Sequence, residues 1–105
     1  AKLGANFGGL SGPAIKPIAI YKVFQTYQSI KDKNIPIIGI GGIENADDII
    51  EFILAGAHAV QIGTSTMIYK TTFAKIISDI KKKLINFNEI KINNLVGNVV
   101  LNNGL

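Results

Sequence analysis

Two short glycine-containing signals in this chain could hold a phosphate group. Gly41-Gly42 follows the apolar run 35–40, and Gly63-Thr64 follows the apolar run 59–62. Glycine lets the backbone approach an anion closely, and backbone N–H groups near a helix N-terminus attract negative charge. The hydroxyl of Thr64 adds another hydrogen-bond donor. The two signals therefore predict a binding site for a phosphate monoester.

Two parallel strands are needed to bring these signals together. The run 35–40 is continuously apolar, which is typical of a strand covered on both faces, and the run 59–62 is similar. A helix between two such strands gives a right-handed βαβ unit. We therefore expect the two runs to be adjacent parallel strands, with both glycine signals at their carboxyl edge.

The segment 43–56 between the strands predicts one helix. Asn45 is placed to cap its N-terminus, and Asp47 and Asp48 fall in the first turn, where negative charge is favourable. Gly56 suits the position just past the C-terminus. These signals favour capping over acid–base chemistry for the acidic residues, and the same holds for Glu44.

Helices are also expected over 17–30, 71–86 and 89–96, the last ending at Gly97. Pro17 suits a first helical turn. The apolar face of the first helix is predicted to consist of Ile20, Val23, Phe24 and Tyr27. The apolar stripe of the helix 71–86 is predicted to consist of Phe73, Ile76, Ile77, Ile80 and Leu84. Residues 1–13 and 98–105 are expected to form a glycine-rich loop and a tail.

Composition narrows the class of protein. The chain has 105 residues, of which 48% are hydrophobic and 17% are charged, as in a packed globular body. It has no cysteine, and His58 is its only histidine, so thiolate and multi-histidine metal sites are excluded. No apolar stretch reaches the roughly 20 residues of a membrane span, and no signal peptide is recognisable. A cytoplasmic location is expected.

The net charge of +4 comes from eleven lysines and no arginine. Without arginine there are no bidentate contacts to bases, and no basic stripe is interleaved with aromatic residues, so nucleic-acid binding is disfavoured. The run 81–83, which is Lys-Lys-Lys, is expected to be the solvated face of a helix.

Two strands flanked by helices leave raw sheet edges and an uncovered apolar face, which makes a poor free-standing fold. Alternating strands and helices with glycines at strand carboxyl ends are typical of the end of a (β/α)8 (TIM) barrel of about 250 residues, whose phosphate site commonly follows strands 7 and 8. The predicted fold class is therefore α/β. Residues 1–105 are expected to be the C-terminal part of one barrel domain, about strands 7–8 with flanking helices.

Three segments together resemble a known family. They are 8–17 (GGLSGPAIKP), 35–43 (IPIIGIGGI) and 55–64 (AGAHAVQIGT). In this order and spacing they resemble the C-terminal part of a dihydroorotate dehydrogenase, closest to the NAD-linked class 1B enzymes.

This resemblance implies an FMN enzyme of pyrimidine biosynthesis that oxidises dihydroorotate to orotate. The FMN contacts that it implies are Gly12, Gly41, Gly42, Gly63 and Thr64. No catalytic residue is expected in this chain, because the family's active-site loop lies upstream and the class 1B base is a cysteine. The implied partners are an electron-transfer subunit with FAD and an iron–sulfur cluster, in a heterotetramer, or a second copy in a homodimer.

Several other residues are candidates for a site. Lys16 is more simply a surface residue than a phosphate ligand, and His58 is expected to be structural, at the amino edge of the sheet. Gly12 could merely supply a turn. The remaining candidates, for which packing or a loop role is the simpler interpretation, are Asn6, Met67 and Tyr69.

Two alternatives stay open. The chain could come from another phosphate-binding barrel, such as an FMN-dependent tRNA-modifying reductase or a sugar-phosphate enzyme. It could also be a non-catalytic barrel piece that needs a partner chain.

Overall fold

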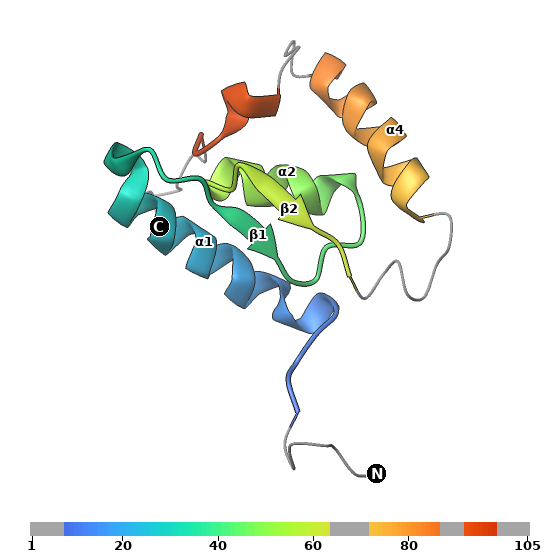
Figure 1. Ribbon diagram of the computed structural model, residues 1–105. Helices are drawn as coiled ribbons and strands as arrows, with labels where there is room; N and C mark the ends of the chain where they lie inside the picture. The colour runs from blue at the N-terminus through green and yellow to red at the C-terminus, as the bar shows by residue number, and fades with distance from the viewer. Residues whose placement is uncertain (1–7, 64–71, 87–91, 99–105) are drawn as a thin grey trace, which may run out of the picture.

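The computed structural model describes residues 8–63, 72–86 and 92–98 (Figure 1). Helices and strands alternate, as predicted for an α/β chain. In chain order the elements are the 3-10 turn η1 (Pro13–Ile15), helix α1 (Lys16–Ile30), the 3-10 turn η2 (Lys31–Lys33), strand β1 (Ile38–Ile40), helix α2 (Ala46–Ala55), strand β2 (Ala59–Gln61), helix α4 (Thr72–Asn86) and the 3-10 turn η3 (Ile92–Leu95).

Strands β1 and β2 are parallel neighbours. Their register pairs Ile38 with Ala59 and Ile40 with Gln61. The predicted βαβ unit is therefore confirmed, and the residues that follow the two strands meet at one sheet edge (Figure 1).

Both strands are shorter than the apolar runs 35–40 and 59–62 predicted. Pro36 has no N–H to donate, and the backbone of Ile37 pairs with the loop before β2. Its N–H donates to Nδ1 of His58 over 3.0 Å, and its carbonyl accepts from the N–H of His58 over 2.8 Å. Regular pairing therefore begins only at Ile38.

Helix α2 covers one face of the two strands. A Cβ built on Gly39 would lie 2.5 Å from Cδ1 of Phe52, so β1 and α2 are in direct contact there. On the other face, Ile38 is 54% exposed and Ile40 is 57% exposed. Neighbouring side chains point to opposite faces of a sheet, so only one face of the pair is packed among the described residues, as expected for two strands without the rest of a barrel.

The apolar core is built around α2, which contacts α1, α4, β2 and η3. Phe52 and Ala57 are completely buried in it. Figure 1 shows α2 behind the strands, with α1 on one side and α4 on the other.

Helix α2 begins and ends as predicted. The Asp48 N–H donates to Oδ1 of Asn45 over 2.9 Å, which caps the N-terminus. At the other end Gly56 has φ 134°, and its N–H donates to the carbonyls of Phe52 and Ile53. This positive φ is open to glycine and strained for other residues.

The flanking helices differ slightly from expectation. All four residues predicted for the apolar face of α1 pack into the core, and Val23 is the buried one among them. In α4, Ile76 is buried and Ile80 and Leu84 are partly buried, but Ile77 is 42% exposed. Residues 76, 80 and 84 are four apart and share one side of a helix, whereas residue 77 is turned by about 100° from 76.

The expected last helix is observed only as η3, within 89–96, and Gly97 follows it with φ 74°. Among the described residues, no helix has both the length and the apolar character needed to cross a bilayer.

Candidate phosphate-binding site

A pocket of about 270 Å³ lies at the carboxyl edge of β1 and β2. Its walls are Leu10, Ser11, Gly12, Pro13, Ile15, Ile40, Gly41, Gly42, Ile43, Glu44, Gln61 and Gly63. Four of the five predicted phosphate-binding residues are thus brought together, although 12 and 63 are far apart in the sequence. The fifth, Thr64, lies outside the described residues.

Gly42 is the point at which two walls of the pocket meet. Its φ is 73°, and a Cβ built on it would lie 2.7 Å from Cβ of Lys16 and 2.8 Å from the carbonyl oxygen of Gly12. Real Cβ atoms do not approach other atoms so closely, so glycine is required here by packing as well as by conformation.

Gly41 fits closely against the same helix start. Its φ is 129°, and a Cβ on it would lie 3.0 Å from Cβ of Ala19 and 3.2 Å from Cγ2 of Ile15. The Gly41-Gly42 pair therefore joins the loop after β1 to the beginning of α1. This packing role adds to the predicted approach to an anion.

Gly12 and Gly63 have no such close neighbours. Gly12 has φ 81°, and its carbonyl accepts from the N–H of Ile15 over 3.1 Å, which confirms that it forms a turn. Gly63 has no positive φ, and a Cβ on it would meet no atom of the described residues within 4 Å. Nothing in the described part of the chain requires glycine at position 63, so its small size keeps this part of the pocket wide.

Two polar residues of the pocket were not identified from the sequence. Ser11 contributes a hydroxyl, and Gln61 contributes an amide from the uncovered face of β2. Gln61 could have been identified from the sequence, because it is the polar residue within the apolar run 59–62. Both side chains can donate to phosphate oxygens.

The electrostatics of the pocket depend on backbone dipoles. None of the described residues that line it is lysine, and one, Glu44, is acidic. The positive end of the α1 dipole lies at this wall, because η1 and the first residue of α1 follow Gly12 directly. Small backbone-rich walls with hydroxyl and amide donors fit a phosphate group.

Lys16 does not behave as the expected surface residue. Its Nζ lies 2.5 Å from Oδ1 of Asp48 and 3.0 Å from Oε2 of Glu51, both on α2. The hydrogen bond to Asp48 raises the pKa of Lys16, against the opposing effect of burial. The side chain is directed to α2 carboxylates and not to the pocket.

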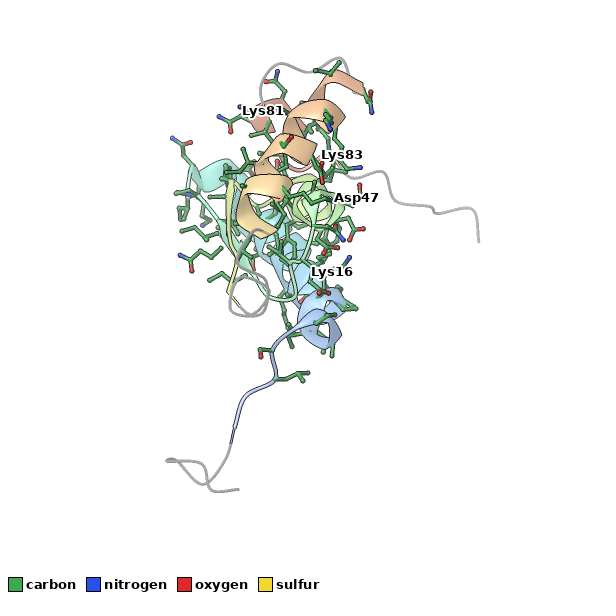
Figure 2. All side chains as sticks on the ribbon, turned by 90° about the vertical axis from the view of Figure 1, so that its right-hand side faces the viewer. Lys16, Asp47, Lys81 and Lys83 are labelled. Atoms are coloured by element: carbon green, nitrogen blue, oxygen red, sulfur yellow. The ribbon has the colours of Figure 1, made fainter. Side chains whose placement is uncertain are left out.

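The acidic residues at the start of α2 have the predicted structural roles. Oδ2 of Asp48 accepts from the N–H of Glu44 over 2.9 Å, so Asp48 completes the cap that Asn45 begins. Asp47 lies 2.5 Å from Nζ of Lys83. In Figure 2, Asp47 and Lys83 lie next to each other, and Lys81 lies on the other side of α4.

The expectation of a fully solvated lysine face on α4 is therefore wrong at Lys83. Lys81 and Lys82 are exposed as predicted. Lys83 instead joins α4 to α2 through Asp47, and its side chain is 33% exposed.

His58 is structural, as predicted, because its Nδ1 accepts the N–H of Ile37 at the amino edge of the sheet. Within the described ranges no group of three or more His, Cys, Asp or Glu side chains is placed to hold a metal ion. Asn6, Met67 and Tyr69 lie outside the described residues.

Comparisons with known proteins identify the family of this chain. The family model for dihydroorotate dehydrogenase matches residues 1–87. The chain is 48% identical over 95 residues to the dihydroorotate dehydrogenase B (NAD(+)) catalytic subunit of Desulforamulus reducens, covering 90% of this chain and 30% of that protein. It is 49% identical over 93 residues to the same subunit of Malacoplasma penetrans, covering 89% and 28%.

The fold also matches a solved structure. The crystal structure of the Eimeria tenella enzyme DHODH in complex with ferulenol superposes with a TM-score of 0.78 at 29% identity, over 87% of this chain and 24% of that one. The chain spans about 30% of the length of the curated relatives that it matches. On the match to residues 1–87 and the identity to these relatives, the chain belongs to the dihydroorotate dehydrogenase family.

Proposed function

We propose that this chain is the C-terminal part of a dihydroorotate dehydrogenase barrel and forms the phosphate-binding site for its FMN. One observation carries the proposal. Four residues implied as FMN contacts, Gly12, Gly41, Gly42 and Gly63, line a single pocket at the carboxyl edge of two parallel strands. Barrels of this kind bind phosphate groups at this edge, in the loops after strands 7 and 8, which β1 and β2 would then be.

The uncovered face of the strands supports a barrel. Ile38 and Ile40 on this face are more than half exposed, and Gln61 belongs to the same face of the pair. Inward-facing side chains of a (β/α)8 barrel pack against those of the other strands. The remaining strands of the proposed barrel would bury this face.

The proposed reaction is the oxidation of dihydroorotate to orotate in de novo pyrimidine biosynthesis. FMN supplies the hydride acceptor when it is bound. Within this chain, the Gly41-Gly42 loop, Gly63 and Thr64 hold the phosphate through backbone N–H groups and a hydroxyl, and Ser11 adds a donor. These contacts orient the cofactor. The catalytic base and the substrate-binding residues are assigned to other parts of the proposed barrel.

The proposed class is the NAD-linked one. Several relatives carry the name dihydroorotate dehydrogenase B (NAD(+)), catalytic subunit, and the word subunit implies a partner. We assign to this chain an electron-transfer partner with FAD and an iron–sulfur cluster, in a heterotetramer, with a homodimer as the alternative. A cytoplasmic location follows from the same assignment.

A substitution at position 63 tests the site. In the full-length protein, Gly63→Asp places a carboxylate beside the proposed phosphate, and a Cβ at this position meets no atom of the described part of the chain within 4 Å. We expect purified Gly63→Asp protein to fold and to lose FMN, measured as flavin absorbance per protein. The companion variant Gly42→Asp should also lose FMN, but Gly42 is in close contact with Lys16 and its loss of FMN could follow from misfolding.

Gly9→Asp is the control, because a Cβ on Gly9 also has no described neighbour within 4 Å and Gly9 does not line the pocket. It should retain FMN. Near wild-type flavin content in folded Gly63→Asp protein would contradict the proposed site. Absence of flavin from the wild-type protein would favour a sugar-phosphate barrel.

A further inference from the structure

The ion pair between Lys16 and Asp48 connects two helix starts that lie beside the pocket. Lys16 is the first residue of α1, and Asp48 is in the first turn of α2. Their charged atoms are 2.5 Å apart, and Glu51 lies 3.0 Å from the same Nζ. The side chain of Asp48 is only 9% exposed, and Asp48 is the single charged residue that is buried among the described residues.

Each partner of the pair also contacts a wall of the pocket. Oδ2 of Asp48 accepts from the N–H of Glu44, which is in the loop after β1. The backbone N of Lys16 would lie 3.0 Å from a Cβ on Gly42, and Ile15 directly before it lines the pocket. One carboxylate therefore holds the Gly41–Glu44 loop with one oxygen and the start of α1 with the other.

From this arrangement we propose that Lys16 is a positioning residue for the FMN phosphate: by neutralising buried Asp48, it fixes the two glycine walls at the spacing that the phosphate requires. The inference depends on the proposed function, because it assigns this role to the same pocket. Lys16 is not among the residues that line the pocket. It acts through Asp48 and the loop that Asp48 holds.

Lys16 can position the loop only because its ammonium group neutralises the buried carboxylate of Asp48. A buried carboxylate without a cation is strongly unfavourable, so it must take up a proton or turn toward water. Both responses weaken the bond from Oδ2 to the Glu44 N–H and release the loop from α1. The raised pKa of Lys16 keeps the ammonium charged throughout the neutral range.

The pair Lys83–Asp47 is a control from the same start of α2, with a more exposed carboxylate: the Asp47 side chain is 70% exposed and that of Asp48 is 9% exposed. It also has charged atoms 2.5 Å apart and also joins α2 to another helix, as Figure 2 shows. Neither residue lines the pocket. Replacing Lys83 therefore tests how the loss of an ion pair between two helices, away from the pocket, changes the Kd for FMN and the Tm.

The experiment compares Lys16→Met, Lys16→Arg, Lys83→Met and the double variant Lys16→Met/Asp48→Asn in the full-length protein. The readouts are the Kd for FMN and the Tm of the flavin-free form. Lys16→Met should weaken FMN binding about tenfold, which corresponds to ~1.4 kcal/mol. Lys16→Arg keeps the charge and should bind FMN within about threefold of wild type.

The double variant separates positioning from general stability. Asp48→Asn removes the unpaired charge and keeps an oxygen for the Glu44 N–H, so it should recover part of the affinity that Lys16→Met loses. Lys83→Met should change the Tm only slightly, because its carboxylate partner is 70% exposed, and should leave the Kd unchanged.

The inference is overturned if Lys16→Met binds FMN as wild type does, or if Lys83→Met weakens binding equally. Wild-type protein that binds no FMN would instead overturn the proposed function, and the two failures are therefore distinguishable.

Discussion

Gly42 and Gly63 line the same pocket but differ in what surrounds them. Gly42 has φ 73° and would overlap Lys16 and the carbonyl of Gly12 if it carried a Cβ. A Cβ on Gly63 would have no neighbour within 4 Å among residues 8–63, 72–86 and 92–98. Alanine substitutions should therefore distinguish a glycine that packing requires, Gly42, from one that is proposed only to leave room for the phosphate, Gly63.

We expect Gly42→Ala to lower the free energy of unfolding of the flavin-free protein by about 2 kcal/mol or more, because alanine must adopt a positive φ against backbone atoms. Gly63→Ala should change it by no more than about 0.5 kcal/mol. Denaturant unfolding of the flavin-free variants measures both values. Equal destabilisation by the two substitutions would show that the pocket walls are not in the contact described at Gly42.

A second prediction at the residue scale concerns pH. The hydrogen bond to Asp48 raises the pKa of Lys16 above its ordinary value of 10.5. The folded state thus binds the proton more tightly than the unfolded state, so the pair contributes fully below 10.5 and loses its contribution as pH rises through the folded pKa.

The difference in unfolding free energy between wild type and Lys16→Met should therefore be largest near neutral pH and shrink in strongly alkaline solution. Denaturant unfolding at a series of pH values measures it. A difference that grows with alkaline pH would contradict the assigned pairing.

At the scale of the elements, the end of α2 and its packing against α1 both depend on Gly56. Gly56 has φ 134°, and a Cβ on it would overlap the side chain of Tyr27 from α1. Gly56→Ala should therefore both strain the end of α2 and push α1 away, at a cost of about 2–4 kcal/mol.

Gly9→Ala is the control, since Gly9 has neither a positive φ nor a neighbour within 4 Å. Thermal unfolding of the full-length variants should show a clearly lower Tm for Gly56→Ala and an unchanged one for Gly9→Ala. A Tm for Gly56→Ala equal to that of wild type would mean that α1 and α2 are not packed as described.

Features that depend on residues close together in the sequence could be predicted from the sequence alone. The cap of α2 at Asn45 and its end at Gly56 were predictable because capping depends on residue types a few positions apart. Gly41, Gly42 and Gly63 were predictable because the carboxyl ends of parallel strands meet at one edge, whereas Gly12 was expected only from the family resemblance. The packed face of α1 followed from its periodicity.

Features that depend on distant residues were not predictable in this way. The pairing of Lys16 with Asp48 spans 32 positions, and that of Lys83 with Asp47 joins two helices, so neither leaves a local pattern. β1 is shortened because Ile37 pairs with His58, 21 positions away. The packing reason for glycine at 42 also depends on α1, which the loop sequence does not contain.

At the scale of the whole molecule, the strand pair has one packed face and one apolar face without cover among the described residues. Ile38 and Ile40 on the second face are 54% and 57% exposed. Two strands alone cannot close a barrel, and an isolated two-stranded sheet is marginally stable in water. The proposed barrel would supply the missing neighbours.

The last prediction is that these 105 residues alone neither bind FMN tightly nor oxidise dihydroorotate. The pocket of about 270 Å³ provides only the phosphate end of a flavin site, and no catalytic side chain is assigned to it. Supplying the rest of the proposed barrel, in the same chain or as a second chain, should restore both properties. The measurement is dihydroorotate-dependent bleaching of flavin absorbance, with the full-length protein as the positive control. Bleaching by the 105 residues alone would show that the catalytic groups lie in this chain, and that their assignment to other parts of the barrel is wrong.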